Sequence, residues 1–145
     1  MNTAEQPIEQ REDERFHAQT GVLAEPETCI TRVSHVLDIS MGGVAFTYVD
    51  EKAWPEWSGS VNLLFPLKGF FLRHLPFESL YDFPAVNEHT KLPIRRRGGK
   101  WGRLSRSQSS LLKYFIENYT TAKAESDLDS EARVSKALRV AVGFG

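Results

Sequence analysis

The sequence lacks a long apolar run and a secretory signal pattern, and it has a single cysteine. It contains one cysteine, Cys29, among 145 residues, which excludes an internal disulfide and suits a reducing compartment. No apolar run approaches the roughly 20 residues of a membrane-spanning helix, and the acidic N-terminus lacks the basic-then-apolar pattern of a secretory signal. The net charge of −1 gives no overall attraction to nucleic acid. These absences predict a cytoplasmic protein without membrane insertion.

Catalytic and metal-binding patterns are also missing. The four histidines do not have the spacing of metal ligands, and a lone cysteine adds no second thiolate. There is no Gly-x-Ser-x-Gly elbow, and Gly98-Gly99-Lys100-Trp101 lacks both the upstream glycine and the Ser/Thr of a phosphate loop. The sequence therefore predicts no catalytic residue, no metal ion and no cofactor.

The length and the hydrophobic fraction of 41% predict a single globular domain. Residues 1–15 have no apolar periodicity and are expected to form a flexible leader. The domain itself is expected at 16–120. Residues 121–145 are expected to form a tail with a possible short helix.

Short β-like runs separated by Gly, Pro and Asp dominate the first two thirds of the domain. The predicted strands are 16–24, 29–39, 43–49, 60–66, 69–75, 77–83 and 94–101. Trp54 is expected to anchor the turn between two of them. Ser105 and Gln108 then have the spacing of a helix capping box. Apolar residues recur after them at three- and four-residue intervals, which predicts a helix of about four turns: Leu111, Leu112, Phe115, Ile116 and Tyr119.

Many short strands followed by one helix predict a closed or nearly closed antiparallel barrel, because a small β-rich chain must protect its strand edges. Alternation along 29–40 divides its side chains between two faces. The more apolar face, expected to turn inward, holds Cys29, Thr31, Val33, His35, Leu37 and Ile39. Asp38 and Ser40 are therefore predicted to project outward together. Gly42 and Gly43 then let the backbone turn or let a ligand approach closely.

Two short motifs carry the functional information. Arg11 and Arg15 stand four residues apart, and Asp38-Ile39-Ser40-Met41-Gly42-Gly43 follows some twenty residues later. Each is weak alone, because paired arginines are often solvated and Asp-x-Ser before glycine is often a turn. Together and in this order they resemble the signature of the PilZ family, Arg-x-x-x-Arg followed by Asp/Asn-x-Ser-x-x-Gly. The resemblance covers about residues 8–120.

The resemblance implies a mainly β fold, a six-stranded antiparallel barrel with a C-terminal α-helix. It also implies a bacterial receptor for cyclic di-GMP that is not an enzyme and signals through ordering of its N-terminal segment and contacts with a protein effector. The residues that it assigns to the nucleotide are Arg11, Arg15, Asp38, Ser40 and Gly43, with Gln10 and Gly42 as adjoining contacts.

These residue types suit cyclic di-GMP. A carboxylate such as that of Asp38 can accept hydrogen bonds from the N1–H and N2–H groups of guanine. Arginine binds guanine O6/N7 or phosphate with two parallel hydrogen bonds and stacks on purines, which lysine cannot match. Glu12, Asp13 and Glu14 lie between the two arginines and can pair with them in the free protein. Such exposed pairs contribute only about 0–1 kcal/mol each and would soften the affinity without abolishing it.

Two alternatives remain open. A PilZ-like adaptor would keep the barrel and act through protein contacts without a nucleotide. A small β-barrel RNA- or DNA-binding module would use the basic stretch at 91–106, in which no acidic residue interrupts Lys91, Arg95, Arg96, Arg97, Lys100, Arg103 and Arg106. We favour a solvated loop and strand edge for this stretch, since strand edges often carry such charges. Nucleic-acid binding is therefore not expected.

Overall fold

The structure is a computed structural model that describes residues 13–27, 34–55, 58–85, 89 and 91–124. Gln10, Arg11, Glu12, Cys29, Thr31, Val33 and the short helix expected in the tail lie outside the described residues. The elements follow one another as β1 (Phe16–Ala18), β2 (Leu23–Pro26), β3 (Ser34–Ile39), β4 (Gly43–Val49), β5 (Ser58–Phe65), the 3-10 turn η2 (Pro66–Lys68), β6 (Phe70–Ala85), β7 (Ile94–Trp101), α1 (Arg106–Tyr119) and β8 (Thr120–Lys123).

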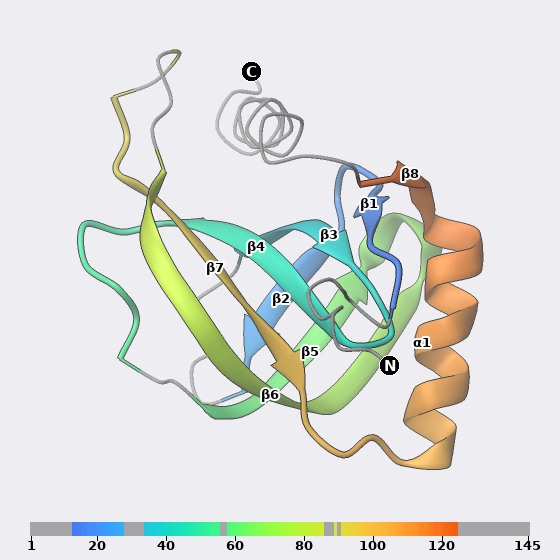
Figure 1. Ribbon diagram of the computed structural model, residues 1–145. Helices are drawn as coiled ribbons and strands as arrows, with labels where there is room; N and C mark the ends of the chain where they lie inside the picture. Colours follow the sequence, from blue (N-terminus) through green and yellow to red (C-terminus); the bar gives the residue numbers. More distant parts are fainter. Residues whose placement is uncertain (1–12, 28–33, 56–57, 86–88, 90, 125–145) are drawn as a thin grey trace, which may run out of the picture.

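The strands form a closed antiparallel barrel of six strands with one helix beside it (Figure 1), which confirms the predicted fold class. Around the barrel the order is β2-β5-β6-β7-β4-β3, and pairing between β2 and β3 closes the ring. β1 and β2 pair with successive parts of the same edge of β3. β8 pairs with β1 outside the ring. In the described part of the chain, no helix is long and apolar enough to cross a membrane.

Three predicted strand boundaries differ from the structure. The run 16–24 is broken into β1 and β2 by a turn at Gly21, whose φ of +103° lies in the left-handed region that favours glycine. The runs 69–75 and 77–83 are one strand, β6, because Pro76 lies where pairing with β7 is only beginning, and a missing amide donor is tolerated there. Residues 120–123, where the tail was expected to begin, form β8.

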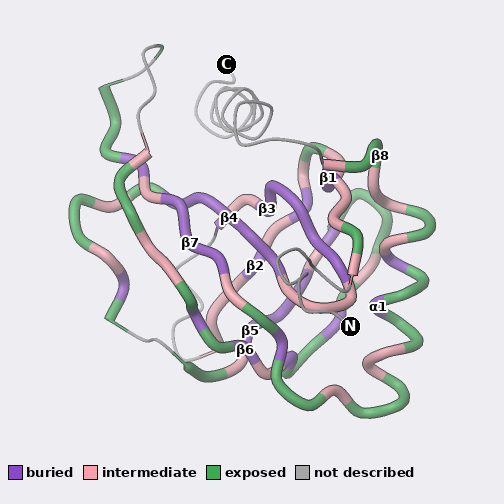
Figure 2. Tube along the Cα trace, in the orientation of Figure 1, coloured by how far each residue is buried: buried purple, intermediate pink, exposed green. Residues whose placement is uncertain are grey.

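The helix closes the core from one side. The predicted capping box is present: Gln108 N donates to Ser105 Oγ at 3.0 Å, and Ser105 N donates to Gln108 Oε1 at 2.9 Å. Leu112 and Phe115 are fully buried in the same apolar cluster as the inward side chains of the barrel. Figure 2 shows these buried positions of α1 alternating with exposed ones. Phe70 meets Phe115 with ring centroids 5.3 Å apart, which joins the helix to β6.

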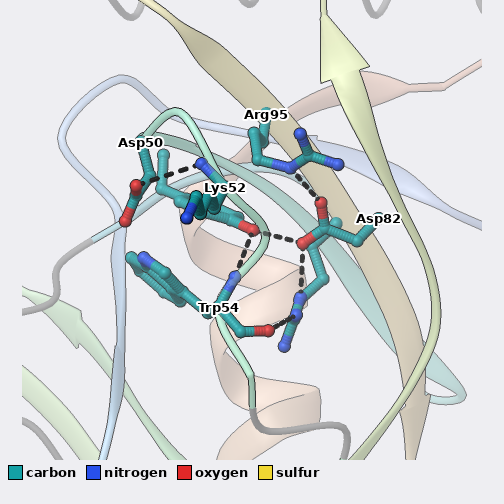
Figure 3. A network of polar contacts seen from close by, with 7 residues as sticks. Asp50, Lys52, Trp54, Asp82 and Arg95 are labelled. Atoms are coloured by element: carbon teal, nitrogen blue, oxygen red, sulfur yellow. Dashed lines mark hydrogen bonds and ion pairs between the residues drawn. The ribbon is translucent and has the colours of Figure 1, made fainter.

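A buried polar network ties the β4–β5 loop to β6 and β7 (Figure 3). The carboxylate of Asp82, whose side chain is fully buried, accepts hydrogen bonds from Arg95 Nε at 2.5 Å and Arg97 Nε at 2.8 Å. Tyr48 Oη also donates to Asp82, and Trp54 N donates to Tyr48 Oη at 3.0 Å. Burial raises the pKa of Tyr48 to about 12, and its hydrogen bond to Asp82 acts in the same direction. Trp54 therefore anchors this loop as predicted.

This network corrects our interpretation of the basic stretch. β7 lies between β4 and β6 in the barrel and is not an edge strand. The side chains of Arg95, Arg96 and Arg97 are only 14%, 8% and 4% exposed, and all three face buried carboxylates. They form neither a solvated edge nor an open phosphate-binding patch, because burial of an arginine requires a paired charge.

Asp82→Ala is expected to destabilise the fold by about 3–5 kcal/mol, because it leaves two buried guanidinium groups without their carboxylate. Glu78→Ala is the matched control: its carboxylate is 57% exposed and meets Lys100 at 3.7 Å, and such pairs contribute about 0–1 kcal/mol. Urea denaturation of both variants measures the difference. Equal losses in the two variants would show that the Asp82 network does not support the barrel.

Candidate functional site

A cavity of about 390 Å³ lies on the outer face of the barrel, where β3 turns into β4. One bank is formed by the end of β3, the turn and the start of β4, and contributes Asp38, Ser40, Gly42, Gly43, Val44 and Ala45. Leu80 and Tyr81 of β6 and Gly99 and Lys100 of β7 line the other bank. Asp13 and Arg15 enter from the segment before β1. The volume falls in the range of small-molecule sites, about 300–1,000 Å³.

The cavity brings together every predicted site residue that the structure describes, namely Arg15, Asp38, Ser40, Gly42 and Gly43. Gln10 and Arg11 lie outside the described residues, so their placement is not established. Among the described residues no group of three or more His, Cys, Asp or Glu side chains could hold a metal ion.

The register of β1 against β3 positions Arg15. Phe16 pairs with Ile39 and His17 with Asp38. Continued by one residue, this antiparallel register sets Arg15 opposite Ser40, on the same face as Asp38. The backbone of Arg15 is also held from the other side, because its carbonyl accepts a hydrogen bond from Ala124 N at 2.8 Å.

Asp38 lies between two guanidinium groups. Arg15 Nη1 is 3.6 Å from Asp38 Oδ1, and Arg96 Nη2 is 3.7 Å from Asp38 Oδ2. The Asp38 side chain is 2% exposed, and a carboxylate so buried is costly unless positive charges offset its lost hydration. The two arginines provide this compensation from β7 and from the segment before β1.

Over residues 34–40, the part of 29–40 that the structure describes, the predicted orientation is partly wrong. Asp38 and Ser40 do share the cavity face, but both are buried, at 1% and 6% exposure. A register shift between Val36 and Asp38 interrupts the alternation. Val36 and Ile39 therefore enter the main core, whereas Leu37 packs in a separate cluster with Ile94. A bulge adds one unpaired residue, which reverses the faces before it.

Ser40 shapes the turn that follows it. Its Oγ accepts hydrogen bonds from Gly42 N at 3.0 Å and Gly43 N at 3.1 Å, and its own N donates to Gly43 O at 2.9 Å. Trp101 fastens the turn to β7, because its Nε1 donates to Ser40 O at 3.1 Å and its backbone N to Gly42 O at 3.0 Å. The Ser40 hydroxyl therefore stabilises the turn in the protein without ligand.

The two glycines of the motif meet different neighbours. A Cβ on Gly43 would lie 2.1 Å from the backbone oxygen of Gly99, so β4 and β7 approach too closely there for any side chain. A Cβ on Gly42 would lie 2.8 Å from Oδ2 of Asp13, a side chain that can move. Gly43 is thus required by the fold, whereas Gly42 leaves room at the cavity.

The sequence analysis did not assign four residues to the site. Three of them line the cavity and the fourth, Arg96, faces the Asp38 carboxylate: Asp13, Tyr81, Lys100 and Arg96. The Tyr81 ring lies against β7, where a Cβ on Gly98 would come within 2.2 Å of its hydroxyl oxygen. Alternation along 95–97 would have separated Arg96 from its neighbours, which share the opposite face. A description of the three arginines as one basic patch does not show this difference in orientation.

The fold is found in solved structures. The chain matches the PilZ domain of YcgR from Escherichia coli with c-di-GMP at a TM-score of 0.58 and 12% identity, covering 88% of this chain and 98% of that one. It matches the K. pneumonia MrkH–c-di-GMP complex at a TM-score of 0.60 and 12% identity, over 88% of this chain and 56% of that one.

The longer YcgR chain from Escherichia coli in complex with c-di-GMP gives a TM-score of 0.57 and 15% identity, over 90% of this chain and 50% of that one. The chain thus spans about half the length of MrkH and of this YcgR chain. No protein-family description and no curated protein sequence matches it. The chain has the PilZ fold.

Gly43→Ala is expected to destabilise the protein by about 1–3 kcal/mol, because the new methyl group overlaps the Gly99 backbone and forces β4 and β7 apart. Gly42→Ala is the matched control and is expected to change stability by less than about 1 kcal/mol, since only the Asp13 side chain must move. Thermal or urea unfolding of the two variants tests this difference. A Gly43→Ala protein as stable as the wild type would contradict it.

Proposed function

We propose that the protein is a non-enzymatic receptor for cyclic di-GMP. The observation that carries the proposal is the cavity in which Arg15 and Asp38 meet beside the Ser40–Gly43 turn. The solved PilZ structures that match this fold include complexes with c-di-GMP, which supports the same class of ligand here. The family signature is complete over the residues that the structure describes, and this supports the proposal further.

Three charged side chains of the cavity each have a ligand group to suit them. Asp38 would accept the N1–H and N2–H donors of a guanine. Arg15 would turn from Asp38 to guanine O6/N7 or to a phosphate, which its planar fork binds with two hydrogen bonds. Lys100, 60% exposed on the opposite bank, would meet a phosphate as a point charge. Ser40 and Gly43 would contribute chiefly by holding the turn in shape.

The N-terminal segment would transmit the signal. Asp13 already lines the cavity, and two residues span at most about 7 Å, so Arg11 is tethered within reach of a bound nucleotide. We propose that the ligand draws residues 8–12 onto the barrel, with Arg11 and Gln10 as contacts. The change in surface would then be recognised by a protein effector.

The two alternatives are less well supported. A nucleic-acid module would need the arginines of β7 at the surface, but Arg95 and Arg97 are held by Asp82 and Arg96 faces Asp38. An adaptor without nucleotide would have no use for a cavity that collects an arginine and a carboxylate. It predicts no binding, so one titration decides between adaptor and receptor.

Calorimetry with cyclic di-GMP, cyclic di-AMP and single-stranded RNA is expected to show binding of cyclic di-GMP in preference to the other two. Arg15→Ala or Arg11→Ala should weaken binding by about 1.5–3 kcal/mol, because each removes charge-assisted hydrogen bonds. Asp38→Ala should reduce the preference for guanine over adenine more than it reduces overall affinity for the phosphates. Arg103→Ala, a substitution of an exposed arginine outside the cavity, is the control.

Wild-type affinity in the Arg11/Arg15 double variant would contradict the site assignment. Tighter binding of RNA than of cyclic di-GMP would favour the nucleic-acid module instead. Absence of binding to all three ligands would favour the adaptor.

Hydrogen exchange is expected to show slower exchange at residues 8–13 when cyclic di-GMP binds, and slower proteolysis there, because ordering of the segment accompanies binding. The helix at 106–119 is expected to change little, since it packs on the barrel away from the turn. Equal protection of residues 8–13 with and without ligand would mean that the site is preformed, and the proposed signalling step would be wrong.

A further inference from the structure

Asp13 lies three residues before β1 and lines the candidate site. Its side chain approaches the turn between β3 and β4, because a Cβ on Gly42 would lie 2.8 Å from Asp13 Oδ2 and 3.7 Å from its Cγ. The carboxylate therefore lies against the turn, at the wall of the cavity.

Glu14 has the opposite orientation. Its carboxylate meets Lys123 Nζ at 2.9 Å, away from the cavity lining, and 61% of its side chain is exposed. Of these two neighbouring acidic residues, only Asp13 lines the site. The chain thus offers two carboxylates of equal charge, one in the cavity and one at the surface.

The side chains that line the cavity carry equal numbers of positive and negative charges, and Arg96, outside the lining, adds a positive charge 3.7 Å from Asp38. Asp13 and Asp38 contribute two negative charges, and Arg15 and Lys100 contribute two positive ones. A cyclic dinucleotide brings two phosphodiester charges into this space. Asp38 has a guanine edge to bind, but a carboxylate against the turn repels phosphate and attracts the same cations that phosphate needs.

We propose that Asp13 is an internal competitor for the anionic ligand and sets the affinity threshold of the site. This inference rests on the proposed function. In the free protein the carboxylate occupies the space beside the Ser40–Gly43 turn, and the nucleotide must displace it to reach Arg15. An anion without a guanine edge makes no contact with Asp38 that could offset this repulsion. Such an anion is therefore not bound tightly enough to occupy the site. A built-in repulsive group of this kind is one way in which a site rejects weak ligands.

The test compares Asp13→Asn with Glu14→Gln by calorimetry with cyclic di-GMP at low and high ionic strength. Asp13→Asn is expected to bind at least about fivefold more tightly at low salt, because a like charge in a partly buried site is removed. The gain should shrink at high salt as the repulsion is screened. Glu14→Gln removes the same charge one residue away, at an exposed pair, and should stay within about twofold of the wild type. Unfolding of both variants without ligand verifies that they are folded.

The outcomes separate this inference from the proposed function. Wild-type binding with no gain in Asp13→Asn overturns the competitor role alone, and weaker binding would make Asp13 an acceptor for the ligand instead. An equal gain in Glu14→Gln would reduce the effect to net charge and also overturn it. Binding by Asp13→Asn but not by the wild type would support it in its strongest form. If neither the wild type nor Asp13→Asn binds cyclic di-GMP, both the proposed function and this inference are overturned.

Discussion

The pairing of β1 with the end of β3 is the constraint on which the candidate site depends. It brings Arg15 and Asp13, which precede β1, into the cavity beside Ser40 and Gly42, so these residues face the motif that follows β3. β8 holds the other edge of β1, and Ala124 binds the carbonyl of Arg15. The site therefore depends on residues 120–124, which follow the helix and do not themselves line the cavity. A change in any of these strands would move the arginine relative to the carboxylate.

The signature residues divide by what they do in the free protein. Ser40 caps the turn and Gly43 permits the contact of β4 with β7, so both are explained by the fold alone. Arg15 and Asp38 are different, because a buried carboxylate between two guanidinium groups adds little to stability relative to apolar packing. Their meeting in a cavity is the observation on which the proposed ligand site rests.

β7 serves the core and the site at once. Arg95 and Arg97 point to Asp82 inside the barrel, and Arg96 points to Asp38 on the outer face. The buried network fixes the position and direction of β7. Arg95 and Arg97 thereby position the guanidinium of Arg96, which lies between them in the sequence. Gly98 and Gly99 then remove side chains from the next part of β7, which admits the ring of Tyr81 at Gly98 and the backbone of Glu78 at Gly99.

The sequence by itself determined the class of fold, the helix with its capping box, and the motif residues Arg15, Asp38, Ser40, Gly42 and Gly43, which line the cavity. These follow from short-range patterns: alternation, helical spacing and the order of residues in a signature. Only the tertiary structure decided which face each residue takes, because the bulge after Val36 and the turn at Gly21 change the count of residues between pairings. It also decided that the arginines of β7 are internal and that Asp13 lies on the turn. Charge along a chain does not reveal its partners, since Asp82 reaches Arg95 and Arg97 from the preceding strand β6, and Asp38 reaches Arg96 from β3, far away in the sequence.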